Sequence, residues 1–154
     1  MIIRDYPLGV GANQYVMVAN LGGYSSRAGV AWNYGSRSAP VHNSYYLVFA
    51  ELGPVGLVGL LAVLASVILT GLRATRKLAA EERSELLLGF VGALIIVSIH
   101  MAFEWLFATS YIHYLLAMNM GAVVGLAAVL RARSPARTKQ STAASHPTLG
   151  PKTA

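Results

Sequence analysis

Residues 52–72 read LGPVGLVGLLAVLASVILTGL, an apolar run without a charged residue. A helix over this run is long enough to cross the ~30 Å hydrocarbon core of a bilayer. Going backwards, the apolar stretch extends to Ser44 and is interrupted only by Glu51. The sequence therefore predicts a first transmembrane helix over residues 44–72.

The whole chain has the composition of a membrane protein. Of its 154 residues, 55% are hydrophobic and 12% charged, with a mean hydropathy of +0.54,. Two further apolar runs, residues 86–107 and 111–130, predict a second and a third span. The fold class that we expect is an all-α membrane protein, in which three transmembrane helices are preceded by an irregular periplasmic loop region over residues 1–43.

The distribution of charge predicts the topology. The formal charge of +6 is concentrated in basic clusters at 73–83 and 131–139, which three spans place on one side. The positive-inside rule makes that side cytoplasmic, so residues 1–43 lie outside. This placement explains the charge better than nucleic-acid binding does, and it favours a multi-pass membrane protein. Residues 131–154, rich in Ser, Thr, Pro and Ala, are predicted to be a disordered cytoplasmic tail.

The N-terminal residues contain no export signal. Residues 1–11 lack a basic region followed by an apolar one, so nothing in them would export the loop that follows. We therefore expect the chain to be the C-terminal part of a larger polytopic protein. The absence of cysteine excludes disulfides and thiolate–metal sites.

A polar pair, His42–Asn43, stands at the start of the first apolar run. A helix beginning near Asn43 would place Gly53 and Gly56 on the face of His42, where another helix or a lipid chain could approach closely. Pro54 predicts a kink. A plainer interpretation of the pair is that His42 is an interfacial residue and that Asn43 caps the helix.

Three motifs occur in order along the chain. His42 and Asn43 are followed at fixed spacing by Gly53 and Gly56, in a pattern of His, then Asn, Ser or Gln, nine residues, Gly, two residues, and Gly, Thr or Tyr. Upstream, DYPLGVGANQY (5–15) is similar to a Pro-x-x-Gly-x-Gly segment with one residue fewer before its first glycine. Downstream, HMAFEWL (100–106) contains His-x-x-x-acid. Together these motifs resemble those of the O-antigen ligase and O-antigen polymerase-like membrane glycosyltransferases.

The resemblance implies transfer of a glycan from a polyprenyl diphosphate carrier to a hydroxyl of a glycan or lipid-core acceptor, in surface polysaccharide assembly and without a metal or other cofactor. It places this reaction at the periplasmic face of the bacterial inner membrane. It implies that His42 assists the acceptor hydroxyl and that Arg27 and Arg37 hold the diphosphate. Imidazole can accept a proton near neutral pH, and guanidinium forks match phosphate oxygens. The supporting candidates are Asn43, Glu51, Gly53, Gly56, His100 and Glu104. A further arginine of the family, upstream of the Pro-Gly-Gly segment, has no counterpart here.

Other functions fit parts of the sequence. A non-catalytic membrane protein could use the same outer pocket to bind lipid-linked sugars, or the chain could be an inactive remnant. An ion or proton channel could be built on His100, Glu104 and His113, and would need an oligomer. A metal site formed by these groups with His42 is disfavoured, because polar groups at a helix end more often pair with each other.

Overall fold

The structure is a computed structural model that describes residues 2–38, 40–77, 83–104, 106 and 110–144, the last stretch as backbone alone from residue 133. Its secondary structure, where described, is entirely helical, as expected. Four short helices come first: α1 (Ile2–Asp5), α2 (Tyr15–Leu21), α3 (Tyr24–Arg27) and α4 (Tyr34–Ser38). Three long helices follow: α5 (Ser44–Lys77), α6 (Ser84–His100) and α7 (Ser110–Ala144).

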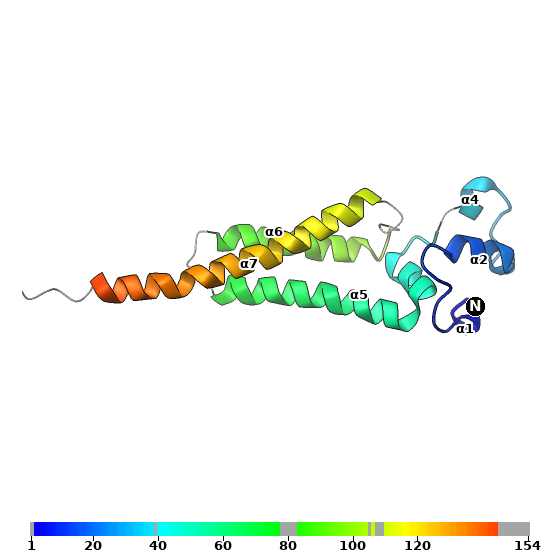
Figure 1. Cartoon of the computed structure of the whole chain (residues 1–154). Helices are drawn as coiled ribbons and strands as arrows, with labels where there is room; N and C mark the ends of the chain where they lie inside the picture. Colours follow the sequence, from blue (N-terminus) through cyan, green and yellow to red (C-terminus); the bar gives the residue numbers. More distant parts are fainter. Residues whose placement is uncertain (1, 39, 78–82, 105, 107–109, 145–154) are drawn as a thin grey trace, which may run out of the picture.

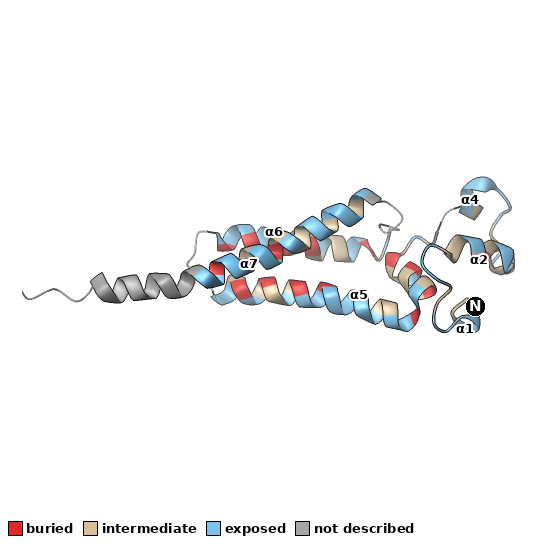
Figure 2. Cartoon of the chain, in the orientation of Figure 1, coloured by how far each residue is buried: buried red, intermediate tan, exposed pale blue. Residues whose placement is uncertain are grey.

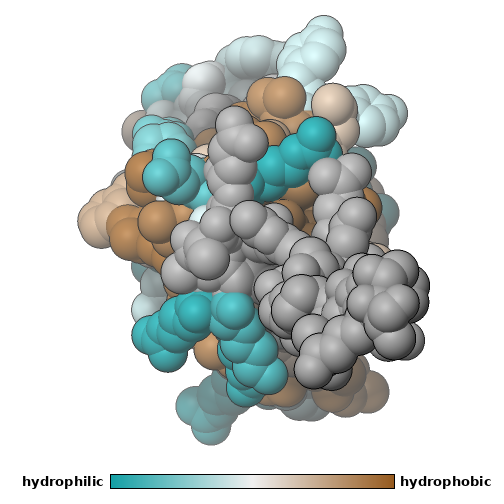
Figure 3. Space-filling model, turned by 90° about the vertical axis from the view of Figure 1, so that its left-hand side faces the viewer, coloured by the Kyte–Doolittle hydropathy of each residue, from teal (hydrophilic) through white to brown (hydrophobic). Residues whose placement is uncertain are grey.

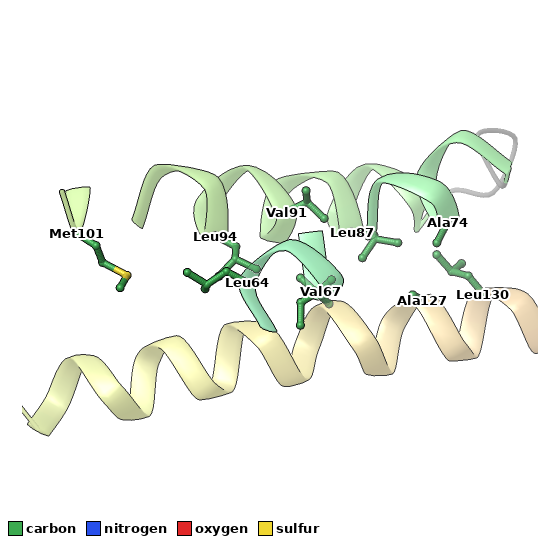
Figure 4. Packing of buried hydrophobic residues seen from close by; sticks show 10 residues of the cluster. Leu64, Val67, Ala74, Leu87, Val91, Leu94, Met101, Ala127 and Leu130 are labelled. Atoms are coloured by element: carbon green, nitrogen blue, oxygen red, sulfur yellow. The ribbon is translucent and has the colours of Figure 1, made fainter. Parts of the chain in front are cut away.

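The long helices lie side by side, and the short helices gather at the end where α5 begins (Figure 1). Where the long helices pack together, over residues 64–74, 84–94 and 123–130, buried residues recur every three or four positions, so each helix presents one stripe to its neighbours (Figure 2),. The core, drawn in Figure 4, contains Leu64, Val67, Ala74, Leu87, Val91, Leu94, Met101, Val123, Ala127 and Leu130.

Gly71 of α5 packs against side chains of both α6 and α7. A Cβ atom on this residue would lie 2.3 Å from Cγ2 of Val91 and 2.9 Å from Cγ1 of Val123. Because both distances are shorter than van der Waals contact, the packing of α5 against α6 and α7 depends on the missing side chain.

Helix α5 is broken at Gly53, where φ is 68° and ψ is −170°. The predicted kink at Pro54 is thus confirmed. The carbonyls of Ala50 and Glu51, which lose helical donors at the break, accept hydrogen bonds from the amides of Val10 (3.0 Å) and Gly11 (2.9 Å),. The prediction that Gly53 and Gly56 continue the helical face of His42 is wrong, because α5 begins at Ser44 and its helical geometry is interrupted at Gly53.

Two helices in the described part of the chain are long and apolar enough to cross a membrane, Ser44–Lys77 and Tyr111–Ala132. Helix α6 is apolar but shorter, with 17 residues. It ends at His100 rather than at the predicted residue 107, because the following turn bonds to α5: the amide of Ser44 donates to the carbonyls of Met101 (2.8 Å) and Glu104 (3.2 Å).

Helix α7 is longer than the predicted third span. It continues from residue 130 to Ala144, through a stretch whose Ala, Arg, Lys and Gln residues have high helix propensity. The structure thus differs from the predicted disordered tail over residues 131–144, whereas residues 145–154 lie outside the described part of the chain.

At the end of the bundle away from the short helices, hydrophilic residues lie among hydrophobic ones (Figure 3). Ala74 of α5, Leu87 of α6 and Leu130 of α7 belong to one buried cluster there. The basic residues next to them in the sequence therefore share this end, and all are exposed: Arg73, Arg76, Lys77, Arg83 and Arg131.

Candidate functional site

The loop segment of residues 8–11 packs directly on the break in α5. Gly9 has φ +89°, and a Cβ atom there would lie 2.3 Å from the carbonyl oxygen of Glu51 and 2.6 Å from the amide nitrogen of Gly53. A Cβ atom on Gly53 would in turn lie 2.7 Å from the carbonyl carbon of Leu8. Two of the three motifs are therefore held in backbone contact, which only glycine permits at these positive φ values.

Glu51 ties the same loop to α5 through its side chain. Its Oε1 accepts a hydrogen bond of 3.2 Å from the backbone amide of Tyr15. Tyr15 is the first residue of α2, where an acceptor for an orphan amide is stabilising. The carboxylate of Glu51 thus binds loop backbone and positions α2.

Asn43 and Ser44 join α5 to the turn after α6. Oδ1 of Asn43 accepts from the amide of Tyr46 (2.9 Å), which confirms the capping interpretation,. Its Nδ2 donates to the carbonyl of Ala102 (2.7 Å), and the hydroxyl of Ser44 donates to the carbonyl of Glu104 (2.7 Å). The third motif is therefore fixed against the first by side-chain hydrogen bonds.

His42 faces Glu104 across this junction. Its Nδ1 lies 3.7 Å from Oε2 of Glu104, with 66% of the His42 side chain and 42% of the Glu104 side chain exposed. This spacing gives an ion pair when the imidazole is protonated,. His100, one helical turn before Glu104, is exposed at the end of α6, so the structure brings Glu104 rather than His100 to His42.

A cavity of about 430 Å³, which we call the histidine cavity, brings His42 together with Arg37. Its wall also includes Tyr15 and Val16 of α2 and Pro40 of the following loop. Two of the predicted site residues, His42 and Arg37, thus line one cavity.

The guanidinium of Arg37 binds its own loop. Nε donates to the carbonyl of Ala31 (3.2 Å), and Nη2 donates to the carbonyl of Val30 (2.7 Å) and the hydroxyl of Ser26 (3.2 Å). The group also lies 4.5 Å from the centre of the Trp32 ring. Arg37 therefore fastens the loop and places a fixed positive charge at the wall of the histidine cavity.

Arg27, the last residue of α3, contacts a tyrosine of the same helix. Its guanidinium stacks on the ring of Tyr24 at 4.4 Å, and it does not line the histidine cavity. The hydroxyl of Tyr24 donates to Oδ2 of Asp5 at 2.6 Å, and this hydrogen bond is the main reason that the pKa of Tyr24 is raised. Of the two arginines that the resemblance implied, the histidine cavity is therefore lined by Arg37 alone.

A larger cavity of about 700 Å³, the helix cleft, adjoins the histidine cavity, since Val16 and Pro40 line both. Its walls are Leu52, Gly56 and Leu60 of α5 on one side and His113 of α7 on another, with Glu51 at the loop end. Glu51 and Gly56 therefore belong to this cleft, whereas His42 belongs to its neighbour.

Two residues of the site could not be identified from the sequence alone. Ser44 and Tyr15 contribute through contacts between segments far apart in the chain, for which a single sequence holds no signal. Among the described residues, no group of three or more His, Asp or Glu side chains is arranged to hold a metal ion. Comparisons with models of protein families, with curated proteins and with solved structures found no match.

Proposed function

We propose that this chain acts in the transfer of a glycan from a polyprenyl diphosphate carrier to an acceptor hydroxyl. The observation that carries the proposal is the convergence of the three motifs: the Gly9–Gly11 segment packs on Gly53, and the 100–104 segment packs on Asn43. Motifs that are distant in the sequence are thus in contact along the first turns of α5, which supports a shared function.

In the proposed arrangement α5, α6 and α7 all cross the bacterial inner membrane. The exposed basic end of the bundle faces the cytoplasm, and α1 to α4 lie on the periplasmic side. The 17 residues of α6 rise about 26 Å, so the turn at residues 101–104 completes the crossing near the outer headgroups. His42 then stands at the outer membrane surface.

The proposed reaction uses His42 as the proton acceptor. The acceptor hydroxyl oxygen forms a bond to the anomeric carbon of the donor glycan, and the bond between that carbon and the diphosphate oxygen breaks. The hydroxyl proton passes to the imidazole of His42, and polyprenyl diphosphate leaves. Glu104, 3.7 Å from Nδ1, stabilises the imidazolium that forms.

The adjoining cavities fit the two ends of such a donor. The helix cleft offers the apolar side chains of Leu52 and Leu60 to a prenyl chain, with Gly56 between them,. The diphosphate would lie where this cleft meets the histidine cavity, within the field of Arg37,.

The engagement of the arginines favours a second candidate function. Arg37 is bonded to loop acceptors and Arg27 is stacked on Tyr24. Both guanidinium groups therefore have contacts within the protein that would compete with a leaving diphosphate. A protein that binds lipid-linked glycans without transferring them does not need arginines that stabilise a leaving diphosphate.

Reconstitution of the full chain in liposomes distinguishes these functions. The donor is a polyprenyl diphosphate bearing a tritium-labelled oligosaccharide, and the acceptors are a lipid-core oligosaccharide and a free oligosaccharide. Transfer that is lost in His42→Ala and retained in Arg76→Gln, at the opposite end of α5, supports the proposal. Donor binding without release of polyprenyl diphosphate supports the second candidate, and failure to bind the donor contradicts both.

A further inference from the structure

Two aromatic rings stand exposed on the segment that precedes α5, residues 2–38 and 40–43, which we call the N-terminal loop region. Trp32 is 80% exposed and Tyr34, the first residue of α4, is 89% exposed. With Asn20, Asn33 and Arg37 they line a cavity of about 400 Å³, which we call the tryptophan cavity. Large rings are normally buried for their apolar area, so two exposed rings around one cavity require an explanation.

The loop holds the ring of Trp32 and the backbone turn next to Tyr34 in place. The Arg37 guanidinium stacks on Trp32 at 4.5 Å and is itself bonded to the carbonyls of Ala31 and Val30. The amide of Ser36 donates to Oδ1 of Asn33 at 2.8 Å. A surface whose side chains are positioned before binding loses less entropy when a ligand arrives.

The chemistry of the cavity matches a saccharide. The face of a pyranose ring carries C–H groups that pack on aromatic rings, while its hydroxyls need amide or guanidinium partners around the edge. Trp32 and Tyr34 offer the rings, and the side-chain amide of Asn33 lies beside them, whereas Asn20 and Arg37 bind each other and frame the cavity,. We propose that the tryptophan cavity is a subsite for pyranose residues of a glycan chain.

Anchoring in the membrane interface is the competing explanation, because Trp and Tyr are enriched there. Helix α4 packs against α2 rather than joining the long-helix bundle, and it lies at the end of the molecule away from the C-terminal part of α7 (Figure 1). The rings also surround polar side chains, whereas an anchor presents its ring to acyl chains. Both features favour the saccharide.

The subsite deepens the function proposed above and rests on it for its position in the reaction. Arg37 lines both the tryptophan cavity and the histidine cavity, so a glycan lying on Trp32 extends toward His42. The subsite would then hold sugar units beyond the one that reacts, and so contribute to glycan selectivity.

Binding of free oligosaccharides tests the subsite without any donor lipid. The full chain in detergent is applied to immobilised hexasaccharides of glucose, galactose, mannose and N-acetylglucosamine. At least one is expected to bind, and Trp32→Ala is expected to weaken binding about tenfold, with Tyr34→Ala also weaker. Tyr111→Ala, which removes an exposed tyrosine of α7, serves as the matched control and should bind as the wild type does.

A second measurement separates the saccharide from the membrane. Trp105→Phe leaves Trp32 as the only tryptophan of the two in the chain, and its emission in liposomes should not be quenched by brominated lipids. Quenching by these lipids, absence of binding to every hexasaccharide, or equal binding by Trp32→Ala and Tyr111→Ala would each overturn the inference. Since binding needs neither donor nor His42, hexasaccharide binding without glycan transfer would retain the subsite and reject the proposed reaction.

Discussion

Gly9 and Gly53 pack backbone against backbone where the N-terminal loop region meets the break in α5. Both have positive φ values, +89° and +68°, and a Cβ atom on Gly9 would lie 2.6 Å from the amide nitrogen of Gly53. The contact leaves the amides of Val10 and Gly11 aligned with the carbonyls freed by the break. Two unusual backbone conformations, distant in the sequence, thus stabilise each other.

Alanine at Gly9 should therefore destabilise the loop. The added methyl group would meet backbone atoms that cannot move aside, and the positive φ adds strain, together about 1–3 kcal/mol. Thermal unfolding in detergent, followed by circular dichroism, measures the loss. Gly59→Ala is the control, since a Cβ atom there meets nothing within 4 Å; equal effects of the two substitutions would contradict the packing described.

Asn43 should contribute to stability in two separable ways. Asn43→Ala removes both the cap to Tyr46 and the hydrogen bond to Ala102, with an expected loss of about 1–3 kcal/mol. Asn43→Ser retains a capping hydroxyl but is too short to reach Ala102, so its loss should be intermediate. Thermal unfolding of the two variants gives the comparison, and a serine variant as unstable as the alanine variant would rule out the cap.

The bundle should be sensitive to side-chain size at Gly71. Leucine at this position has to displace Val91 and Val123, and overpacking of this kind costs about 1–3 kcal/mol. Gly89→Leu on α6 introduces the same side chain where a Cβ atom meets nothing within 4 Å. Gly71→Leu should unfold at lower temperature than Gly89→Leu in the same detergent, and the reverse order would argue against close packing of α5 on α6.

The long helices were predictable because their signals are local. The apolar run from Ser44 and the kink at Pro54 follow from consecutive residues, and α5 matches both. The end of α6 was not predictable, because it depends on the hydrogen bond from the Ser44 hydroxyl to the carbonyl of Glu104, 60 residues away. That same contact brings Glu104 to His42.

The site was predictable only in part, for a related reason. His42 and Arg37 are close in the sequence and do share a cavity. The sequence could not show that the guanidinium of Arg37 would bind the carbonyl of Val30, or that Arg27 would stack on Tyr24 instead. Which acceptor an arginine reaches depends on how the loop folds, and no local pattern specifies that.

Arg37 should stabilise the N-terminal loop region through contacts that a lysine at this position cannot make. Its planar fork donates in several directions at once, whereas an ammonium group on a flexible chain cannot reproduce this geometry. Arg37→Lys should therefore increase chymotrypsin cleavage after Trp32 and Tyr34 several-fold. Arg27→Lys keeps a cation over the Tyr24 ring,, so its cleavage rate should match the wild type; an equal increase in both variants would show that the guanidinium network is not specific.

The N-terminal loop region should become less stable at alkaline pH, because the hydrogen bond from Tyr24 to Asp5 is lost when the phenol ionises. The pKa of Tyr24 is raised above 10.0, first by this bond and then by burial and the Asp5 charge. Since the protonated phenol is favoured in the folded state, the stabilisation is fully present below the unfolded pKa of about 10 and is lost as the pH rises through the raised value. Subtracting the ultraviolet titration of Tyr24→Phe from that of the wild type isolates Tyr24 among the 8 tyrosines. In Asp5→Asn the isolated transition should move to lower pH, and an unchanged transition would show that Asp5 does not control this phenol.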